Sequence, residues 1–356
     1  EYSSFGQKEL KARYLFDVVT AFLVKNYGYS KTQMIGRTLS LVLYSLCLAI
    51  FFRTLKFNFL QSITCVLGFL FSGQDLFGGE WLVHCYTPKS LAYPLIFLSF
   101  SYFLRNKFYK AIVCFIITTY VHFLVGGTFF TLFLIYLYFK KISLKHIIKY
   151  ISAYALITLP LIVSITSNYF SNTDYSAYND IPDPNWIYSF YRHPHHLAPF
   201  KDLSSFYVSW LGGIIISVPL TFLSVHFLLN NLSGIKKDIA LFNLIILIQL
   251  YICLVIAFFD YSYFFGKFYM FRSSSLALFL SIVLSIIWIN EIITEQRLKN
   301  HFNVFIFSIL LSIHIAPYPW KIVQMVRNQS LGDKIVDKDY RDLINFVLSK
   351  SEKNDI

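Results

Sequence analysis

Three histidines and an arginine gather in YRHPHHLAPF, residues 191–200 of a chain that is otherwise strongly apolar. A guanidinium can grip a phosphate through two parallel hydrogen bonds, and imidazoles can bond phosphate oxygens or sugar hydroxyls. Histidines are also common zinc ligands, but the stiff backbone at Pro194 keeps all three from reaching one ion easily. A polar loop without chemistry is the third interpretation. We favour substrate binding, by Arg192, His193, His195 and His196.

A second polar group lies in GQDLFGGEWLVHCY, residues 73–86, between two apolar runs. Asp75 and Glu80 are the candidate catalytic residues, because a carboxylate this close to an apolar run is costly without a role. Either could act as a general base or as a ligand of a divalent cation, Mg²⁺ or Mn²⁺. His84 is a candidate substrate contact. The glycines here fit a simple turn equally well, and no phosphate-loop motif surrounds them.

Two further segments offer groups that could bind an anionic substrate. His122 stands in YVHFLVGG, where a hydrogen bond between packed helices is the alternative to substrate binding. Lys267 and Arg272 lie in DYSYFFGKFYMFR, residues 260–272. Arg272 fits a phosphate ligand and a snorkelling membrane anchor equally well.

The composition indicates the class of protein, and so the kind of element, that positions these residues. The chain is 56% hydrophobic and 14% charged, whereas soluble domains carry about 25% charged residues. The five cysteines are scattered without a CxxC pair, which indicates neither a zinc knuckle nor a disulfide framework. The net charge of +12 does not indicate nucleic-acid binding, because many of the basic residues flank apolar runs, where they meet lipid headgroups. We therefore expect an all-α integral membrane protein.

About ten apolar runs are long enough to cross a bilayer or a protected part of one. The short pair 109–122 and 124–139 is expected to bend at its junction rather than to form one long helix. The predicted spans are 37–53, 56–72, 89–104, 109–122, 124–139, 148–167, 205–229, 237–259, 272–290 and 303–317.

The positive-inside rule orients these spans. Basic residues concentrate in the loops around 53–56, 105–110, 140–149, 236–237 and 297–299, which we expect to be cytoplasmic. The loops 73–88, 168–204 and 260–271 and the junction 122–127 are poor in lysine and arginine and are expected to be extracytoplasmic, with 168–204 as the one long outer loop. All the candidate site residues then fall on the outer side.

The expected organisation has three parts. Residues 1–36 form amphipathic juxtamembrane helices outside the cytoplasm, 37–317 form the polytopic membrane domain, and 318–356 form a small extracytoplasmic tail. The five basic residues of the first part conflict with an outer location, but they are spread over a long segment, where the rule is weaker. The chain begins without a methionine, so we expect a segment upstream, such as a first membrane helix.

This pattern resembles the GT-C superfamily of polytopic glycosyltransferases, in particular bacterial members. The resemblance is carried by GGEWLVHCYTPKSLAYPLIFL (78–98), YVHFLVGG (120–127), RHPHHLAP (192–199), GKFYMFRSSSLALFL (266–280) and DYRDLINFVLSK in the tail. It implies sugar transfer from a polyprenyl-phosphate-linked donor to a glycan or lipid acceptor, on the extracytoplasmic face of a bacterial inner membrane. The catalytic acid that such enzymes carry in their first outer loop would lie before residue 1.

The resemblance assigns roles to residues of this chain. Glu80 would be a second acidic residue of the site, and Arg272 with the 192–196 cluster would bind the lipid phosphate. A surface-polysaccharide polymerase would share nearly all these features. A lipid-linked glycan transporter or flippase would instead carry charges within its spans, and a non-catalytic assembly subunit is a further alternative.

Overall fold

The computed structural model describes residues 12–78, 82–83, 85–171, 197–200, 206, 210–229, 234–262 and 264–294. Most of these residues are helical and none is in a strand, as the sequence predicted. Five helices are long and apolar enough to cross a membrane, consistent with a multi-pass membrane protein. They are α1 (Tyr14–Leu55), α6 (Leu144–Ser171), α10 (Gly212–Leu229), α11 (Ile235–Phe259) and the segment Met270–Glu291, which includes most of α12 (Ser274–Thr294).

Four shorter helices complete the membrane-like body: α2 (Phe59–Phe71), α3 (Pro88–Phe103), α4 (Phe108–Val121) and α5 (Phe123–Phe139). They coincide with predicted spans but are shorter than a full crossing, so the prediction of about ten spans is not confirmed beyond the five long helices. The predicted span 303–317, most of the long loop 168–204 and the tail 318–356 lie outside the described residues.

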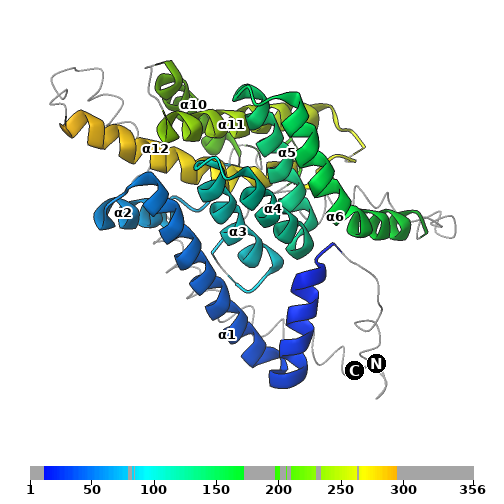
Figure 1. Cartoon of the computed structure of the whole chain (residues 1–356). Helices are drawn as coiled ribbons and strands as arrows, with labels where there is room; N and C mark the ends of the chain where they lie inside the picture. The colour runs from blue at the N-terminus through cyan, green and yellow to red at the C-terminus, as the bar shows by residue number, and fades with distance from the viewer. Residues whose placement is uncertain are drawn as a thin grey trace. The chain divides into compact units, whose positions relative to one another are not determined.

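Helix α1 bends sharply at Gly28, where φ is 74° and ψ is 171°. Figure 1 draws it as two rods that meet at an angle. Residues other than glycine rarely adopt this backbone conformation, so the bend falls where the sequence permits it. The sequence analysis separated juxtamembrane helices from a first span near residue 36. The structure instead places the break at Gly28, and residues 29–55 continue as one helix.

The pair α4 and α5 breaks at His122, whose extended backbone (φ −154°, ψ 101°) separates the two helices. This confirms the predicted bend. Gly126 lies so close to α4 that a Cβ built on it would be 2.5 Å from the Thr119 Cα. The helices can therefore fold back tightly on each other only because this position has no side chain.

The core forms where α3 and α12 pack among the other helices. The segment Met270–Glu291 is the most buried of the candidate spans, at 89%. Aromatic rings fill the space around it: the ring centres of Phe97 and Phe279 are 4.8 Å apart, and those of Phe100 and Phe242 are 4.5 Å apart. Such contacts add to the apolar burial and fix how the helices meet.

One end of this helical body, here called the Lys140 end, is held by polar contacts between helix termini. The guanidinium of Arg105 donates to the Thr54 hydroxyl, which joins the ends of α3 and α1. Lys140 pairs with Asp238, which joins α5 to α11. Lys236 pairs with Glu291 at 2.5 Å, which joins α11 to α12.

The opposite end, here called the His122 end, contains the α4–α5 junction and the described parts of two loops, 72–78 with 82–83 and 85–87, and 260–262 with 264–273. The described cation-rich loops 53–56, 104–110, 140–143 and 236–237 lie at the Lys140 end, each next to one of the contacts given above. Of the loops that the sequence analysis assigned to the other side, the described parts of 73–88 and 260–271 lie at the His122 end, whereas most of 168–204 lies outside the described residues.

Candidate functional site

Arg272 is the buried charge at the His122 end, with 6% of its surface exposed. It belongs to the 3₁₀ turn η6 (Met270–Ser273), and its carbonyl accepts a hydrogen bond of 2.7 Å from the Tyr93 hydroxyl on α3. Its guanidinium carbon lies 4.5 Å from the centre of the Tyr269 ring, and its Nη1 lies 3.1 Å from Nε2 of His122. A charge buried this deeply in a membrane protein is costly and commonly marks a functional site.

His122 must be neutral in this arrangement. A guanidinium only donates hydrogen bonds, so the imidazole nitrogen that faces it has to accept. Burial lowers the pKa of His122 well below its usual value, and the positive charges of Arg272, Lys89 and Arg13 lower it further. The site therefore keeps its positive charge on Arg272 and does not share it with the imidazole.

Lys89 and Arg13 complete a group that we call the basic cluster: Arg13, Lys89, His122 and Arg272. Lys89 follows Pro88 in the first turn of α3, where Thr87 forms a capping box. Arg13 precedes α1, and the N–H of Phe123 donates to the Ala12 carbonyl at 2.9 Å, so the start of α1 is tied to the start of α5. These segments are far apart in the sequence and meet only in the fold.

Asp17 is the ion-pair partner of Arg13 in this cluster. Its Oδ1 lies 3.9 Å from Nε of Arg13, and 57% of the Arg13 side chain is exposed. Pairs this exposed contribute little, about 0–1 kcal/mol. Asp17 therefore neutralises little of the positive charge of Arg13.

Helix starts add to the positive potential of the cluster. Lys89 lies in the first turn of α3, His122 is the residue before α5, and Arg272 lies two residues before the start of α12 at Ser274. The unpaired N–H groups at helix starts favour anions. The Ser274 hydroxyl is buried and has no hydrogen-bond partner among the described residues. A buried hydroxyl normally has a hydrogen-bond partner, and a bound anion or water molecule would provide one for Ser274.

The loop that carries Asp75 packs against Phe271, the residue before Arg272 in the chain. Gln74 closes this loop, since its Oε1 accepts from the N–H groups of Leu82 (3.0 Å) and Val83 (2.8 Å). Phe77 packs on Phe271, with ring centres 6.1 Å apart. Trp210 packs on the same ring at 4.8 Å. Asp75 itself is half-buried, so a carboxylate-bearing segment is fixed beside the basic cluster.

Of the residues proposed from sequence, the structure joins Arg272 and His122 directly and fixes the Asp75 segment beside them. Lys267 lies in the preceding 3₁₀ turn η5 (Gly266–Phe268), and its side chain is outside what the structure describes. The remaining candidates also lie outside the described residues and stay predictions: Glu80, His84, Arg192, His193, His195 and His196.

The sequence analysis missed Lys89, Arg13 and Tyr93. Lys89 could have been noticed, because the preceding Thr-Pro is a typical helix start and a lysine there is unfavourable unless an anion is near. Nothing in the sequence singles out Arg13 among the basic residues of its segment. Tyr93 stands in an apolar run, and its bond to Arg272 joins residues 179 positions apart.

A divalent cation does not fit the basic cluster, whose side chains are cationic or neutral. Among the described residues, no group of three or more histidine, cysteine, aspartate or glutamate side chains could hold a metal ion. The prediction of a bound Mg²⁺ or Mn²⁺ therefore rests on Asp75 and Glu80 alone. The cationic and neutral side chains of the described site are of the kind that bind anions.

The chain matches no protein-family model, no curated protein and no solved structure. Its functional interpretation depends on the residues at the His122 end and on their chemistry.

Proposed function

We propose that this chain is a bacterial inner-membrane glycosyltransferase of GT-C type. It transfers a sugar or an oligosaccharide from a polyprenyl-phosphate-linked donor to a glycan or lipid acceptor. The His122 end faces away from the cytoplasm, and the basic cluster binds the phosphate of the donor.

The buried Arg272, held against neutral His122 with Lys89 and Arg13 nearby, is the observation that carries this proposal. Negative charge grows on the phosphate as the bond to the sugar breaks. Cations fixed in a site of low dielectric lower the energy of that transition state more than cations in water do. His122 adds no negative charge that would offset them.

Transfer also requires a base that removes the proton of the acceptor hydroxyl as it attacks the anomeric carbon. Asp75 suits this role because its loop lies beside the basic cluster, and Glu80 of the same loop is the alternative. Arg192 and the histidines 193, 195 and 196 would complete the phosphate contacts from the long outer loop.

A surface-polysaccharide polymerase fits the same residues, since it would use the same class of lipid-linked donor. A transporter or flippase fits less well, because such proteins bind substrate near the middle of the bilayer. The described ion pairs lie instead at the ends of the helices. A non-catalytic subunit would have no need of a buried, phosphate-binding arginine.

The first prediction concerns Arg272→Lys. Lysine keeps the charge but loses the forked geometry that holds a phosphate by two bonds. Losing one charge-assisted hydrogen bond costs about 1.5–3 kcal/mol, which corresponds to a roughly 10- to 150-fold loss of rate or affinity. We expect surface-glycan assembly in cells to fall by at least about tenfold at unchanged protein level.

Arg105→Lys is the matched control, because Arg105 lies at the Lys140 end and should leave glycan assembly unchanged. Binding of undecaprenyl phosphate and of undecaprenol to the purified proteins separates a phosphate contact from a folding role. Arg272→Lys should weaken binding of the phosphate only. Wild-type binding that does not distinguish the two lipids, or glycan assembly that survives the substitution, would refute the proposal.

A further inference from the structure

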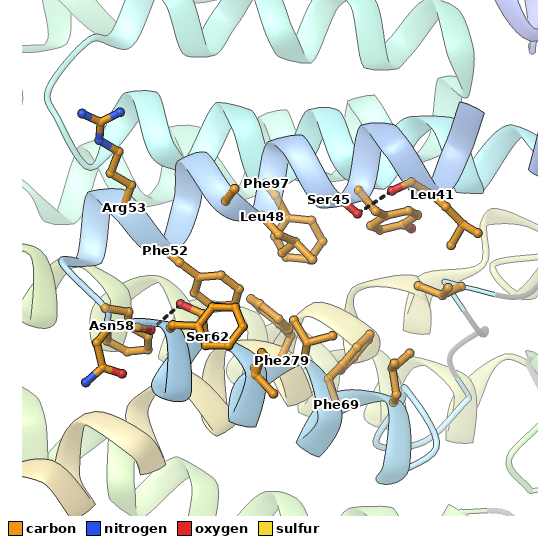
Figure 2. A pocket seen from close by; sticks show the side chains of 18 of the residues that line it. Leu41, Ser45, Leu48, Phe52, Arg53, Asn58, Ser62, Phe69, Phe97 and Phe279 are labelled. Atoms are coloured by element: carbon orange, nitrogen blue, oxygen red, sulfur yellow. Dashed lines mark hydrogen bonds between the residues drawn. The ribbon is translucent and has the colours of Figure 1, made fainter. Parts of the chain in front are cut away.

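An apolar groove of about 770 Å³ runs between α1 and α2, open on one side. Figure 2 shows Arg53 and Asn58 at one end of it and Leu41 toward the other. Phe52, Phe69 and Phe279 contribute to its lining. The volume lies in the range of about 300–1,000 Å³ that small-molecule sites occupy. The side chains around the groove are mainly apolar, so its occupant must be mainly apolar too.

The end of the groove at the Lys140 end of the body carries positive charge. Arg53 and Lys56 line this end and are exposed, and neither forms an ion pair with a described carboxylate. The start of α2, capped by Asn58, lies at the same place. In Figure 2 the Arg53 guanidinium points away from the groove floor, so it would meet a group at the rim and not one inside.

We propose that this groove binds one acyl chain of an anionic phospholipid, whose phosphate lies at the rim between Arg53 and Lys56. The site is separate from the basic cluster, which lies at the opposite end, and it does not depend on the proposed function. The occupant is a bilayer lipid of the leaflet that contacts the Lys140 end.

The size of the groove matches one leaflet. Leu41 and Arg53 are twelve residues apart on one helix, which corresponds to roughly 18 Å at 1.5 Å per residue. Half of the hydrocarbon thickness of a bilayer is about 15 Å. An acyl chain anchored by its headgroup at Arg53 would therefore fill the groove and end near Leu41.

The charge of the rim selects the headgroup. An exposed cation near a membrane surface contributes about 1 kcal/mol of attraction to anionic lipid, and a zwitterionic headgroup of the same size gains less from two cations. Phosphatidylglycerol should therefore bind more tightly than phosphatidylcholine with identical acyl chains.

Native mass spectrometry of the delipidated full chain, titrated with either lipid, tests this proposal. We expect wild type to prefer phosphatidylglycerol. Arg53→Gln with Lys56→Gln should reduce its affinity by about fivefold for each charge removed, and should abolish the preference. Lys107→Gln with Lys141→Gln is the matched control at the same end, and Lys141 even shares the positive φ of Lys56 (58° and 59°).

A second pair of variants tests the groove itself. Ser45 lines the groove, so Ser45→Trp should fill the path of the chain and reduce binding of both lipids. Ser152→Trp places the same side chain on the exposed surface of α6 and should have no effect. The proposal fails if wild type binds the two lipids equally or not at all. It also fails if Ser45→Trp, eluting as wild type does in size-exclusion chromatography, binds phosphatidylglycerol unchanged.

Discussion

At the scale of residues, the contact between Arg272 and His122 sets the charge of the candidate site. A carboxylate in the place of His122 would cancel much of the charge of Arg272, whereas an imidazole that only accepts a hydrogen bond orients the guanidinium and leaves its charge intact. The aromatic face of Tyr269, 4.5 Å from the guanidinium carbon, adds a further attraction that does not neutralise it. The two contacts orient the buried guanidinium without neutralising it.

The lowered pKa of His122 predicts a pH-dependent stability. The unfolded chain takes up a proton near the ordinary histidine pKa of about 6.5, and the folded chain does so only at a lower pH. Between these two values the unfolded state binds more protons, so the folded state loses stability as the pH falls. The loss can reach about 1.4 kcal/mol per pH unit for one group.

Thermal unfolding in detergent at pH 7.5, 6.5 and 5.5 measures this effect. Wild type should lose melting temperature below about pH 6.5, and His122→Gln, which can still accept a hydrogen bond from Arg272, should lose less over the same range. Equal losses in both proteins would mean that His122 does not cause the pH dependence.

Sequence could predict single residues of the site but not their combination. Arg272 and His122 stood out because ionisable residues beside apolar runs are rare and costly. Their contact across 150 positions could not be read from spacing. Lys89 and Arg13 were missed because their relevance comes from the place where α3 and α1 begin, which only the packing of the helices determines.

At the scale of elements, the α4–α5 pair depends on one glycine. A Cβ on Gly126 would contact the Thr119 backbone at 2.5 Å, whereas a Cβ on Gly127 would meet nothing within 4 Å. Overpacking of this kind costs about 1–3 kcal/mol, and alanine is otherwise the better helix former by about 1 kcal/mol. We expect Gly126→Ala to lower the melting temperature of the purified protein and Gly127→Ala to leave it unchanged or raise it. A Gly126→Ala protein as stable as wild type would show that the two helices do not pack this closely.

The sequence predicted part of the secondary structure. The apolar runs gave the helices, and His122 with its two nearby glycines indicated where the α4–α5 pair bends. The break inside α1 was not predicted, because charged and apolar residues alternate on both sides of Gly28 and the hydrophobic pattern does not change there. Its position follows from the backbone freedom of one residue.

At the scale of the whole molecule, the described charges lie at the two ends of the helical body and the apolar side chains between them. Charged groups in the hydrocarbon are expensive, so this separation indicates how the body sits across a bilayer. At the Lys140 end, two carboxylates, Asp238 and Glu291, are each paired with a lysine, while many lysines and arginines remain around them. The same end carries the charged rim of the groove between α1 and α2.

Orientation is the last prediction and follows from this separation of charge. Cation-rich short loops stay in the cytoplasm, so the Lys140 end should face the cytoplasm and the His122 end should face outward, where lipid-linked sugar donors would reach the basic cluster. Ser143 and Ser262 are exposed, one at each end, and each can be changed to cysteine in a background in which the native cysteines are replaced by alanine. A membrane-impermeant maleimide applied to intact spheroplasts should label Ser262→Cys directly and Ser143→Cys only after the membrane is made permeable. The reverse pattern would place the basic cluster in the cytoplasm and exclude a donor bound from the outer face, whereas labelling of both sites without permeabilisation would contradict the separation of the two ends by a bilayer.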